Sequence, residues 1–354
     1  MKVIIGGAGI TGLAVSSYLQ QKGIDFEIFE KSNESPYVST GIQLASNCHF
    51  VFKELGIYDQ IKEASIERKT LKVYSKSKFI NELSVTNKNK EGTLFIRRAD
   101  LLSILSSLIP LEKIKSSKQV SKISSINSGI SLWANNCEVS ADLFIDCMGA
   151  NSKIANNSYI TNSTAIWGIS NFSNESLKSF NNFMYEGMHL VTYPITRNDT
   201  AYTLVINNSK FPALIGKTIT KEDVNKILKN QFRDLINHSK KNVIKPIRAS
   251  NSNKWSKGNI IFLGDSAHSI TPHLAQGAAQ GLIDAAYLNI GFNKNIEPEI
   301  FFKKRNALID RIRSESKLNK NRYQLGMPFN LLRNIYLKLY KPSYSWLFNS
   351  KYEA

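Results

Sequence analysis

The stretch Met1–Ala14, MKVIIGGAGITGLA, decides the fold of this chain. Its β-branched run Lys2–Ile5 is typical of a short buried strand. Gly7, Gly9 and Gly12 follow at once in the spacing G-x-G-x-x-G. We expect Gly7 to permit a tight turn, Gly9 to let the backbone approach a pyrophosphate, and Gly12 to let a helix pack closely on the strand.

The residues after the glycines complete a βαβ unit. A helix is predicted as far as Lys22, and Gly23 is placed to end it. A second strand is predicted at residues 26–29, and the carboxylate of Glu30 after it can accept hydrogen bonds from ribose hydroxyls. The N-terminus of the helix offers unpaired N–H groups and a positive dipole end to phosphates. This order predicts a dinucleotide site, for which FAD and NAD are both candidates.

Length and composition set the class of protein. The chain has 354 residues, which is long for one hydrophobic core, so two domains are expected. It contains no run of about 18 or more uncharged apolar residues, so we expect no membrane-spanning helix. The first strand begins at residue 2, which leaves no room for a signal peptide. Cys48, Cys137 and Cys147 lack metal or redox spacing and are expected to be reduced thiols in a cytoplasmic protein with no metal site.

The charge is strongly basic. The formal net charge is +18, and residues 291–354 contain 13 basic and 5 acidic residues. Such a surface attracts anionic substrates, membranes or nucleic acids, although a solvated helical face is the ordinary alternative. No nucleic-acid motif accompanies the charge, so we expect no nucleic-acid partner. Peripheral membrane contact stays open for the basic, aromatic end of the chain, which contains Arg333, Tyr336, Lys338, Tyr340, Lys341 and Trp346.

Between the two ends the patterns indicate mostly strands. We expect residues 41–61 to form a loop that leads into a helix, residues 70–86 to form strands, and residues 119–145 to form three short strands. Further strands are predicted at Ala165–Ile169, His189–Pro194, Ala201–Ile206 and 244–249, and a helix at 221–238.

A second turn of glycine and acid follows this β-rich insert. Residues 258–263 are typical of a buried strand, which ends in the turn Gly264-Asp265. Residues 272–281 then open a long helix, and a helical tail from Pro298 is broken at Pro328 and Pro342. The second turn must therefore return to the sheet that the first turn begins.

These patterns resemble the single-component FAD-dependent aromatic hydroxylases, the group A flavoprotein monooxygenases. The resemblance is carried by residues 7–12 with Glu30, Gly41-Ile42-Gln43-Leu44 followed by Asn47, Arg98-Ala99-Asp100-Leu101, and Gly264-Asp265-Ser266-Ala267-His268 with Pro272-His273-Leu274-Ala275-Gln276-Gly277-Ala278. Tyr193-Pro194 also matches a strand of the family's substrate domain. The match covers nearly the whole chain, and it is most similar to the salicylate, 3-hydroxybenzoate and 6-hydroxynicotinate hydroxylases.

The resemblance implies an α/β fold with a Rossmann-like FAD-binding domain, a β-rich substrate domain of the p-hydroxybenzoate hydroxylase kind, and C-terminal helices. The FAD-binding domain would take residues 1–70, 94–155 and 255–297, the substrate domain 71–93 and 156–254, and the helical segment 298–354. The implied reaction is hydroxylation of a small, anionic aromatic or heteroaromatic substrate with O₂ through a C4a-hydroperoxyflavin, with NAD(P)H as the reductant.

The resemblance also implies roles for single residues. Gly7, Gly9, Gly12 and Glu30 would hold the dinucleotide, Arg98 would lie beside phosphate or ribityl oxygens, and Asp265 would accept hydrogen bonds from the ribityl hydroxyls of FAD. The helix that begins near Gly277 and Ala278 would point its positive end at the flavin ring. His273 would lie over the flavin, where it either deprotonates a phenol or has a structural role. Tyr193 either lines the substrate cavity or packs in the core.

One motif departs from the family pattern. The family usually has Asp-Gly after the strand at 142–145 and an Arg six residues after that Gly, whereas this chain has Met148-Gly149 and Ala155. We expect this change to weaken reduction by NAD(P)H more than FAD binding, unless Asp146 or Lys153 compensates. Two alternative functions therefore stay open: an FAD-binding protein with impaired use of NAD(P)H, and a membrane-associated hydroxylase of a quinone precursor.

Overall fold

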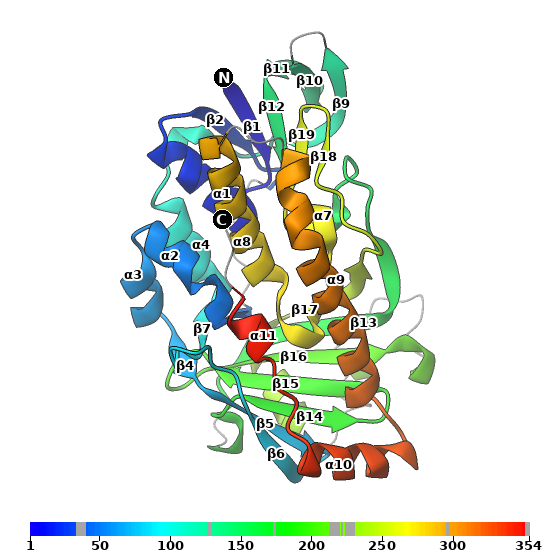
Figure 1. Cartoon of the computed structure of the whole chain (residues 1–354). Coiled ribbons are helices and arrows are strands. Elements are labelled where there is room, and N and C mark those ends of the chain that lie inside the picture. The colour runs from blue at the N-terminus through cyan, green and yellow to red at the C-terminus, as the bar shows by residue number, and fades with distance from the viewer. Residues whose placement is uncertain are drawn as a thin grey trace.

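The computed structural model describes residues 1–32, 40–126, 129–172, 175–211, 220, 222–223, 231–294 and 298–350 (Figure 1). A parallel sheet with its helices forms one end of the molecule, and a large, mostly antiparallel sheet forms the other. The long helix α9 (Pro298–Tyr323) runs from the first end to the second (Figure 1). The division into domains at the residues given above stays a prediction.

The six-stranded sheet at the first end carries the dinucleotide motif. Its strand order is β18-β19-β12-β1-β2-β8, and all neighbours are parallel except β18 and β19. The strands are β1 (Lys2–Gly6), β2 (Asp25–Phe29), β8 (Ile114–Lys115), β12 (Leu143–Asp146), β18 (Ser256–Lys257) and β19 (Ile260–Phe262). Gly6, Asp146 and Phe262 are register partners at the carboxyl ends of β1, β12 and β19. The second glycine-acid turn thus returns to the sheet of the first, as predicted.

Helix α1 (Ile10–Gln21) joins β1 to β2 and is buried over most of its length. Gly23, at φ +65°, lies just beyond the end of α1, which confirms the predicted end of the helix. Thr11 lies where α1 meets two other segments. A methyl group placed on Gly264 would lie 2.7 Å from Thr11 Oγ1, and one placed on Gly281 would lie 2.2 Å from it. Helix α1 therefore packs against the turn after β19 and against helix α8 (Gly277–Lys294) so closely that no side chain fits at Gly264 or Gly281.

The second end is a seven-stranded sheet of order β17-β13-β16-β15-β14-β5-β6, in which only the β14–β5 pair is parallel. Its strands are β5 (Thr70–Ser75), β6 (Lys78–Ser84), β13 (Tyr159–Ser170), β14 (Asn181–Tyr185), β15 (Met188–Pro194), β16 (Thr200–Asn207) and β17 (Ser239–Ala249). These strands confirm the β-rich insert and the strands predicted within 70–86. Of the helix predicted at 221–238, α6 (Gln231–Asn237) is described, and most of its remainder lies outside the described residues.

Two three-stranded sheets complete the β structure, and they correct two predictions. One contains β3 (Gly41–Leu44), β7 (Thr93–Arg97) and β4 (Ile66–Arg68), so the loop predicted at 41–44 is wrong. Four residues are too few for the periodicity of a strand to be recognised, and β3 forms because β7 pairs with it. The other contains β9 (Val120–Ile126), β10 (Gly129–Ala134) and β11 (Cys137–Ala141), so residues 119–145 hold four strands with β12 rather than three. Strand β11 lies at the edge of its sheet and has mostly exposed residues, which makes it the hardest of the four to recognise from sequence.

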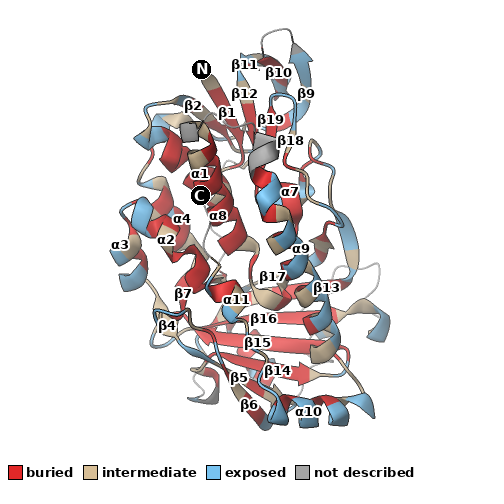
Figure 2. Cartoon of the chain, viewed as in Figure 1, coloured by how far each residue is buried: buried red, intermediate tan, exposed pale blue. Residues whose placement is uncertain are grey.

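The remaining helices are α2 (His49–Glu54), α3 (Tyr58–Glu63), α4 (Arg98–Ser106), α7 (Asp265–His268), α10 (Phe329–Leu339) and α11 (Ser345–Phe348). The predicted breaks at Pro328 and Pro342 are confirmed, since α10 lies between them. Burial is most continuous in β1, β12, α1 and α8 and in the middle of the seven-stranded sheet (Figure 2). No described helix combines the length and the apolar character that crossing a bilayer requires.

Candidate active site

The turn between β1 and α1 forms a cradle that only glycines allow. Gly7 has φ +97°, and a methyl group on it would lie 2.7 Å from the carbonyl oxygen of Cys147. A methyl group on Gly12 would lie 1.9 Å from the carbonyl oxygen of Gly7, so α1 could not pack against the turn. By contrast, nothing lies within 4 Å of a methyl group on Gly9, which faces open space. The backbone beside Gly9 is therefore accessible to a ligand.

The N-terminus of α1 and Glu30 border this cradle. No side chain caps α1 at Gly9, and its first turn holds no acidic residue, so its positive dipole end is not neutralised from within the helix. The Glu30 carboxylate accepts a hydrogen bond from the Ala8 N–H at 2.9 Å and one from the Ser32 N–H at 3.0 Å. The structure thus brings Glu30 next to the glycine turn, where a ribose bound along the turn would meet it.

A second set of predicted residues meets where α7 and α8 begin. Gly264 has φ +61° and turns the chain from β19 into α7, so that Asp265 is exposed at the first position of that helix. A methyl group on Gly277 would lie 3.6 Å from Asp265 Oδ1, which places the carboxylate beside the N-terminus of α8. Arg98 begins α4, where burial lowers the pKa of the guanidinium and the charge of Asp265 opposes that shift.

These groups fit an FAD molecule. The open space at Gly9 and the uncapped end of α1 suit a pyrophosphate, and the exposed carboxylate of Asp265 suits the hydroxyls of a ribityl chain. The N-terminus of α8 at Gly277 and Ala278 suits the negative charge of a reduced flavin ring. The role of each residue toward the cofactor stays a prediction.

A cavity lies between the seven-stranded sheet, the segment before α8 and the C-terminal residues. Its lining is mostly apolar, with amide, hydroxyl and imidazole groups and no charged side chain among the described residues. The lining consists of Gln43, Ala45, Leu71, Val85, Thr93, Phe180, Asn182, His189, Val191, Pro272, His273, Leu274, Ala275, Tyr323, Tyr344, Leu347 and Phe348. Such a lining is typical of a site for a small aromatic molecule.

His273 lines the cavity, on the short turn Pro272–Leu274 that precedes α8. Its side chain is buried, and within the described part of the chain neither ring nitrogen has a hydrogen-bond partner. Burial, with smaller effects of His189 and Lys320, lowers the pKa of His273 well below its usual value. A neutral buried imidazole with two free nitrogens is available to bind a polar group in the cavity. The next turn residue, Ala275, adopts φ 52°, a left-handed conformation that favours glycine and stores strain beside the cavity.

His189 on β15 is a site residue that the sequence analysis missed. Its ring centroid lies 5.1 Å from that of His273 and 5.2 Å from that of Tyr323. Gln324 Nε2 donates to His189 Nδ1 at 3.3 Å, so the neutral ring carries its proton on Nε2. Burial lowers the pKa of His189 to about 3. The sequence did hold a signal for this role, because His189 and Val191 are two residues apart on a predicted strand and therefore share one face of it. In the structure both line the cavity.

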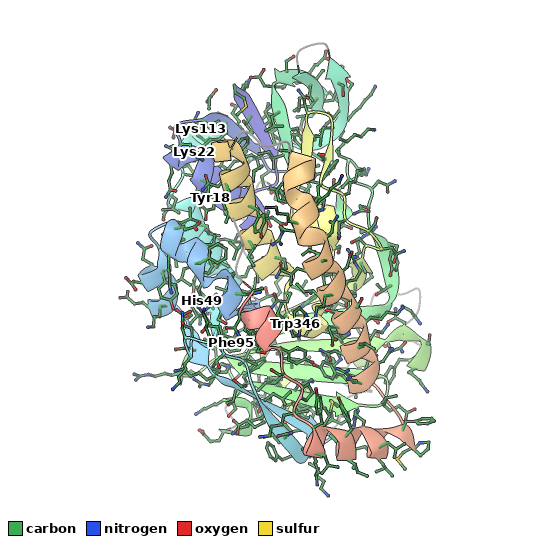
Figure 3. The ribbon with its side chains drawn as sticks, in the orientation of Figure 1. Tyr18, Lys22, His49, Phe95, Lys113 and Trp346 are labelled. Carbon is green, nitrogen blue, oxygen red and sulfur yellow. The ribbon has the colours of Figure 1, made fainter. Side chains whose placement is uncertain are left out.

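Tyr193 lies deeper on the same strand and is not among the lining residues. Its ring stacks on Phe95 of β7 at a centroid distance of 4.8 Å; Phe95 is labelled in Figure 3. Burial raises the pKa of the Tyr193 hydroxyl, and hydrogen bonds with Thr203 and Gln43 oppose that shift. Because Gln43 does line the cavity, Tyr193 reaches the cavity through Gln43 and packs in the core with its ring.

The loop after β12, where the sequence departs from the family pattern, is held by Asp146 and Lys254. The Asp146 carboxylate accepts hydrogen bonds from Ser152 Oγ at 2.5 Å and from the Met148 N–H at 2.9 Å, and burial raises its pKa to about 6. Lys254 Nζ donates to the carbonyl oxygen of Ala155 at 2.5 Å. A carboxylate and an amine therefore lie next to the positions where Met148 and Ala155 stand, and they order the loop from neighbouring places.

Known proteins are similar to this chain in sequence and in fold. The model of the FAD binding domain family matches residues 1–297. The 3-amino-4-hydroxybenzoate 2-monooxygenase of Streptomyces cremeus is 23% identical over 318 residues, which cover 81% of this chain and 77% of that protein. The 3-hydroxybenzoate 6-hydroxylase 1 of Aquipseudomonas alcaligenes is 24% identical over 332 residues, which cover 86% of this chain and 84% of that protein.

Among solved structures, Klebsiella pneumoniae HpxO complexed with FAD and uric acid has a TM-score of 0.82 at 18% identity and covers 98% of this chain and 95% of that one. A salicylate hydroxylase substrate complex has a TM-score of 0.80 at 16% identity, with coverage of 99% and 96%. The fold is therefore that of the FAD-dependent aromatic hydroxylases. The chain belongs to the FAD binding domain family, and FAD is its cofactor.

The role of Asp265 predicts a loss of cofactor affinity in Asp265→Ala. Removing a charged acceptor of ribityl hydroxyls should raise the dissociation constant of FAD by about ten- to a hundredfold. Titration of the apoprotein with FAD, followed by flavin fluorescence, measures it. Asp59→Ala, at an exposed position on α3, is the matched control and should bind like the unchanged protein. Equal affinity of Asp265→Ala and the control would refute the assignment.

The lowered pKa of His189 predicts a pH-dependent stability. The folded pKa of about 3 lies below the unfolded value near 6.5, so this residue's contribution is complete above pH 6.5 and is lost as the pH falls toward 3. The free energy of unfolding should fall by about 1.4 kcal/mol per pH unit for each such histidine across that window. Urea unfolding of FAD-saturated protein between pH 7 and pH 4.5 measures the slope. His189→Gln should show a shallower slope, and an unchanged slope would contradict a neutral buried His189.

Proposed function

We propose that the protein is an FAD-dependent monooxygenase that hydroxylates a small aromatic or heteroaromatic substrate, with NAD(P)H as reductant and O₂ as co-substrate. One observation carries the proposal. A single short segment, from Asp265 to Gly277, contributes an exposed carboxylate and a helix N-terminus on one side and the cavity residues Pro272–Ala275 on the other. The proposed cofactor site and the cavity therefore adjoin, as hydroxylation of a bound ring requires. The cytoplasm is proposed as its location on the sequence argument alone.

Bound FAD supplies electron transfer from the reductant and the activation of oxygen. The chain's own residues have other tasks. The apolar lining excludes water from the ring of the substrate, and Asn182 offers a buried side-chain oxygen without a partner among the described residues. The N-terminus of α8 favours negative charge at the cofactor side of the cavity.

We assign His189 and His273 to the hydroxyl group of the substrate. Both rings are neutral at pH 7, so a free nitrogen of His273 accepts a hydrogen bond from a phenol, and the Nε2–H of His189 can donate one to the oxygen of that hydroxyl group. A base with so low a pKa does not by itself hold the proton of a phenol, whose pKa is about 10. The proton moves to the imidazole only as far as the attraction between the resulting imidazolium and phenolate, in a cavity with few polar groups, offsets that difference.

The lining also bears on the substrate class. The relatives named above act on hydroxybenzoates, and basic composition favoured an anionic substrate here too. No Lys or Arg lines the described cavity, and burying an unpaired carboxylate costs several kcal/mol. Lys320, half-buried on α9, is the cation that acts on His273. We therefore propose an uncharged phenol or hydroxylated heteroaromatic ring as the preferred substrate.

A second candidate is an FAD-binding protein with impaired use of NAD(P)H, which Met148 and Ala155 support. Against it stand Asp146 and Lys254, which order the same loop from neighbouring positions. The two candidates differ in the rate of flavin reduction, and one experiment separates them.

Anaerobic stopped-flow mixing of the FAD-loaded protein with NADH or NADPH measures that rate. Under the monooxygenase proposal, bleaching of the flavin band should accelerate by at least about tenfold with one of a panel of phenols, hydroxypyridines and hydroxybenzoates. A hydroxylated product should then form in air. Slow bleaching throughout, together with a clear acceleration in Met148→Asp, would favour the second candidate. Slow bleaching in both proteins, with no product in air, would refute the monooxygenase proposal.

The uncharged lining predicts the order of substrate affinities. Phenols without a carboxylate should bind at least about tenfold more tightly than the matching hydroxybenzoates, because no lining cation compensates a buried carboxylate. Perturbation of the flavin spectrum measures each dissociation constant. Tight binding of a hydroxybenzoate that is lost in Lys320→Gln would show that Lys320 supplies the missing cation and that the substrate is anionic.

A further inference from the structure

Helix α10 carries an apolar face outward. The exposed apolar side chains of α10 and of the residues at its two ends form a set that we call the α10 face: Met327, Phe329, Leu331, Leu332, Ile335, Tyr336, Leu339 and Tyr340. Leu332 is 65% exposed and Leu339 is 84% exposed. The helix lies at the lower end of the molecule in Figure 1, and most of it is coloured as exposed in Figure 2. A contiguous apolar patch of this kind marks a contact surface.

Polar bonds on the inward side fix this orientation. Arg333 is 6% exposed, and its guanidinium donates to the carbonyl oxygen of Arg322 at 3.0 Å and to Ser75 Oγ at 3.0 Å. Asn81 Nδ2 donates to the carbonyl oxygen of Leu337, whose side chain packs in the cluster formed with β6. Rolling the helix to bury its leucines would expose Leu337 and leave these bonds unmade, so the α10 face stays outward.

The segment that carries the face is positively charged. The sequence contains no Asp or Glu between Glu315 and Glu353, while Lys338 and Lys341 are exposed on and just after the helix. Lys78 and Phe79 are exposed on β6, the strand against which α10 packs. The nearby carboxylate of Glu186, which a methyl group on Gly326 would meet at 2.5 Å, is paired with Lys210 at 3.2 Å. The surface therefore combines apolar side chains with positive charge.

We propose that the α10 face docks on an anionic lipid bilayer. A helix with leucine and phenylalanine on one side, tyrosines at its margin and lysines beside it is built to lie in the plane of the membrane interface. The lysines meet anionic headgroups, and each should strengthen the binding by about fivefold. This inference goes beyond the proposed function and does not depend on it.

A second copy of the chain suits the face less well. A two-fold contact uses the same surface on both copies, so it would bring Lys338 and Lys341 of both copies into one interface, without a carboxylate from this segment to pair with them. The α10 face also leaves out two residues of the basic, aromatic end of the chain that the sequence suggested for membrane contact. Arg333 is buried, and Trp346, labelled in Figure 3, lies 3.9 Å from the guanidinium of Arg311.

Flotation with lipid vesicles tests the proposal on the full-length, FAD-loaded protein. At low salt the protein should float with phosphatidylcholine vesicles that contain about one third phosphatidylserine, and much less with phosphatidylcholine alone. Leu332→Ser combined with Leu339→Ser should weaken the partition coefficient by at least about tenfold. Lys338→Gln combined with Lys341→Gln should weaken it by about tenfold or more on the anionic vesicles alone.

The matched control is Leu111→Ser combined with Ile160→Ser, two exposed apolar residues on other elements, which should float like the unchanged protein. Failure of the unchanged protein to float on anionic vesicles would overturn the proposal, whatever the variants do. So would equal loss in the control pair. A dimer, seen by light scattering without lipid and converted to a monomer by the two leucine substitutions, would assign the face to a second copy instead.

Discussion

The buried carboxylate of Asp284 holds the site together. It lies on α8, accepts a hydrogen bond from the Gly264 N–H at 2.8 Å, and pairs with His268 at 2.6 Å and Arg305 of α9 at 2.8 Å. Burial alone would raise the pKa of Asp284, but His268 and Arg305 outweigh it and the pKa is lowered. Because leaving a buried charge without its partner costs about 3–5 kcal/mol, the turn before Asp265, the helix α8 and the helix α9 are bound to one another by a single group. The position of Asp265 beside the N-terminus of α8 depends on this arrangement.

Support from neighbouring residues also explains how the changed motif after β12 is tolerated. The loop after β12 has Met148 and Ala155 where the family resemblance leads us to expect a carboxylate and a guanidinium. Asp146 nevertheless supplies a carboxylate two residues earlier, and Lys254 supplies a cation from a different part of the chain. The local order needs an acceptor for Ser152 and the Met148 amide, and a donor for the Ala155 carbonyl, rather than particular residue types at particular positions. Asp146 and Lys254 thus replace the missing groups in ordering the loop. The effect of the change on reduction by NAD(P)H is a separate matter.

Much of the fold and of the cofactor site could be predicted from sequence, because the constraints there are local. Gly12 is required by its contact with Gly7, five residues earlier, and Gly7 by the positive φ of the turn itself, while the glycine-acid turn at 264–265 ends a strand that is recognisable by itself. Strand β3 could not be predicted, since its pairing with β7 joins residues about fifty positions apart. The same holds for the cavity, where His189 becomes a site residue only because β15 packs under the turn that carries His273. Tyr193 is the opposite case. It lies on a correctly predicted strand, but it belongs to the core and meets the cavity only through Gln43.

The contact at Thr11 has a consequence for how the two halves of the cofactor site move. Its hydroxyl lies so close to Gly264 and Gly281 that no side chain fits between α1, the second turn and α8. The glycine turn after β1, to which we assign the pyrophosphate, and the turn Gly264-Asp265, to which we assign the ribityl chain, are therefore held at a fixed distance from each other by direct contact. The two turns keep the same spacing before and after the ligand binds. Adaptation to a substrate therefore has to come from the seven-stranded sheet on the far side of the cavity.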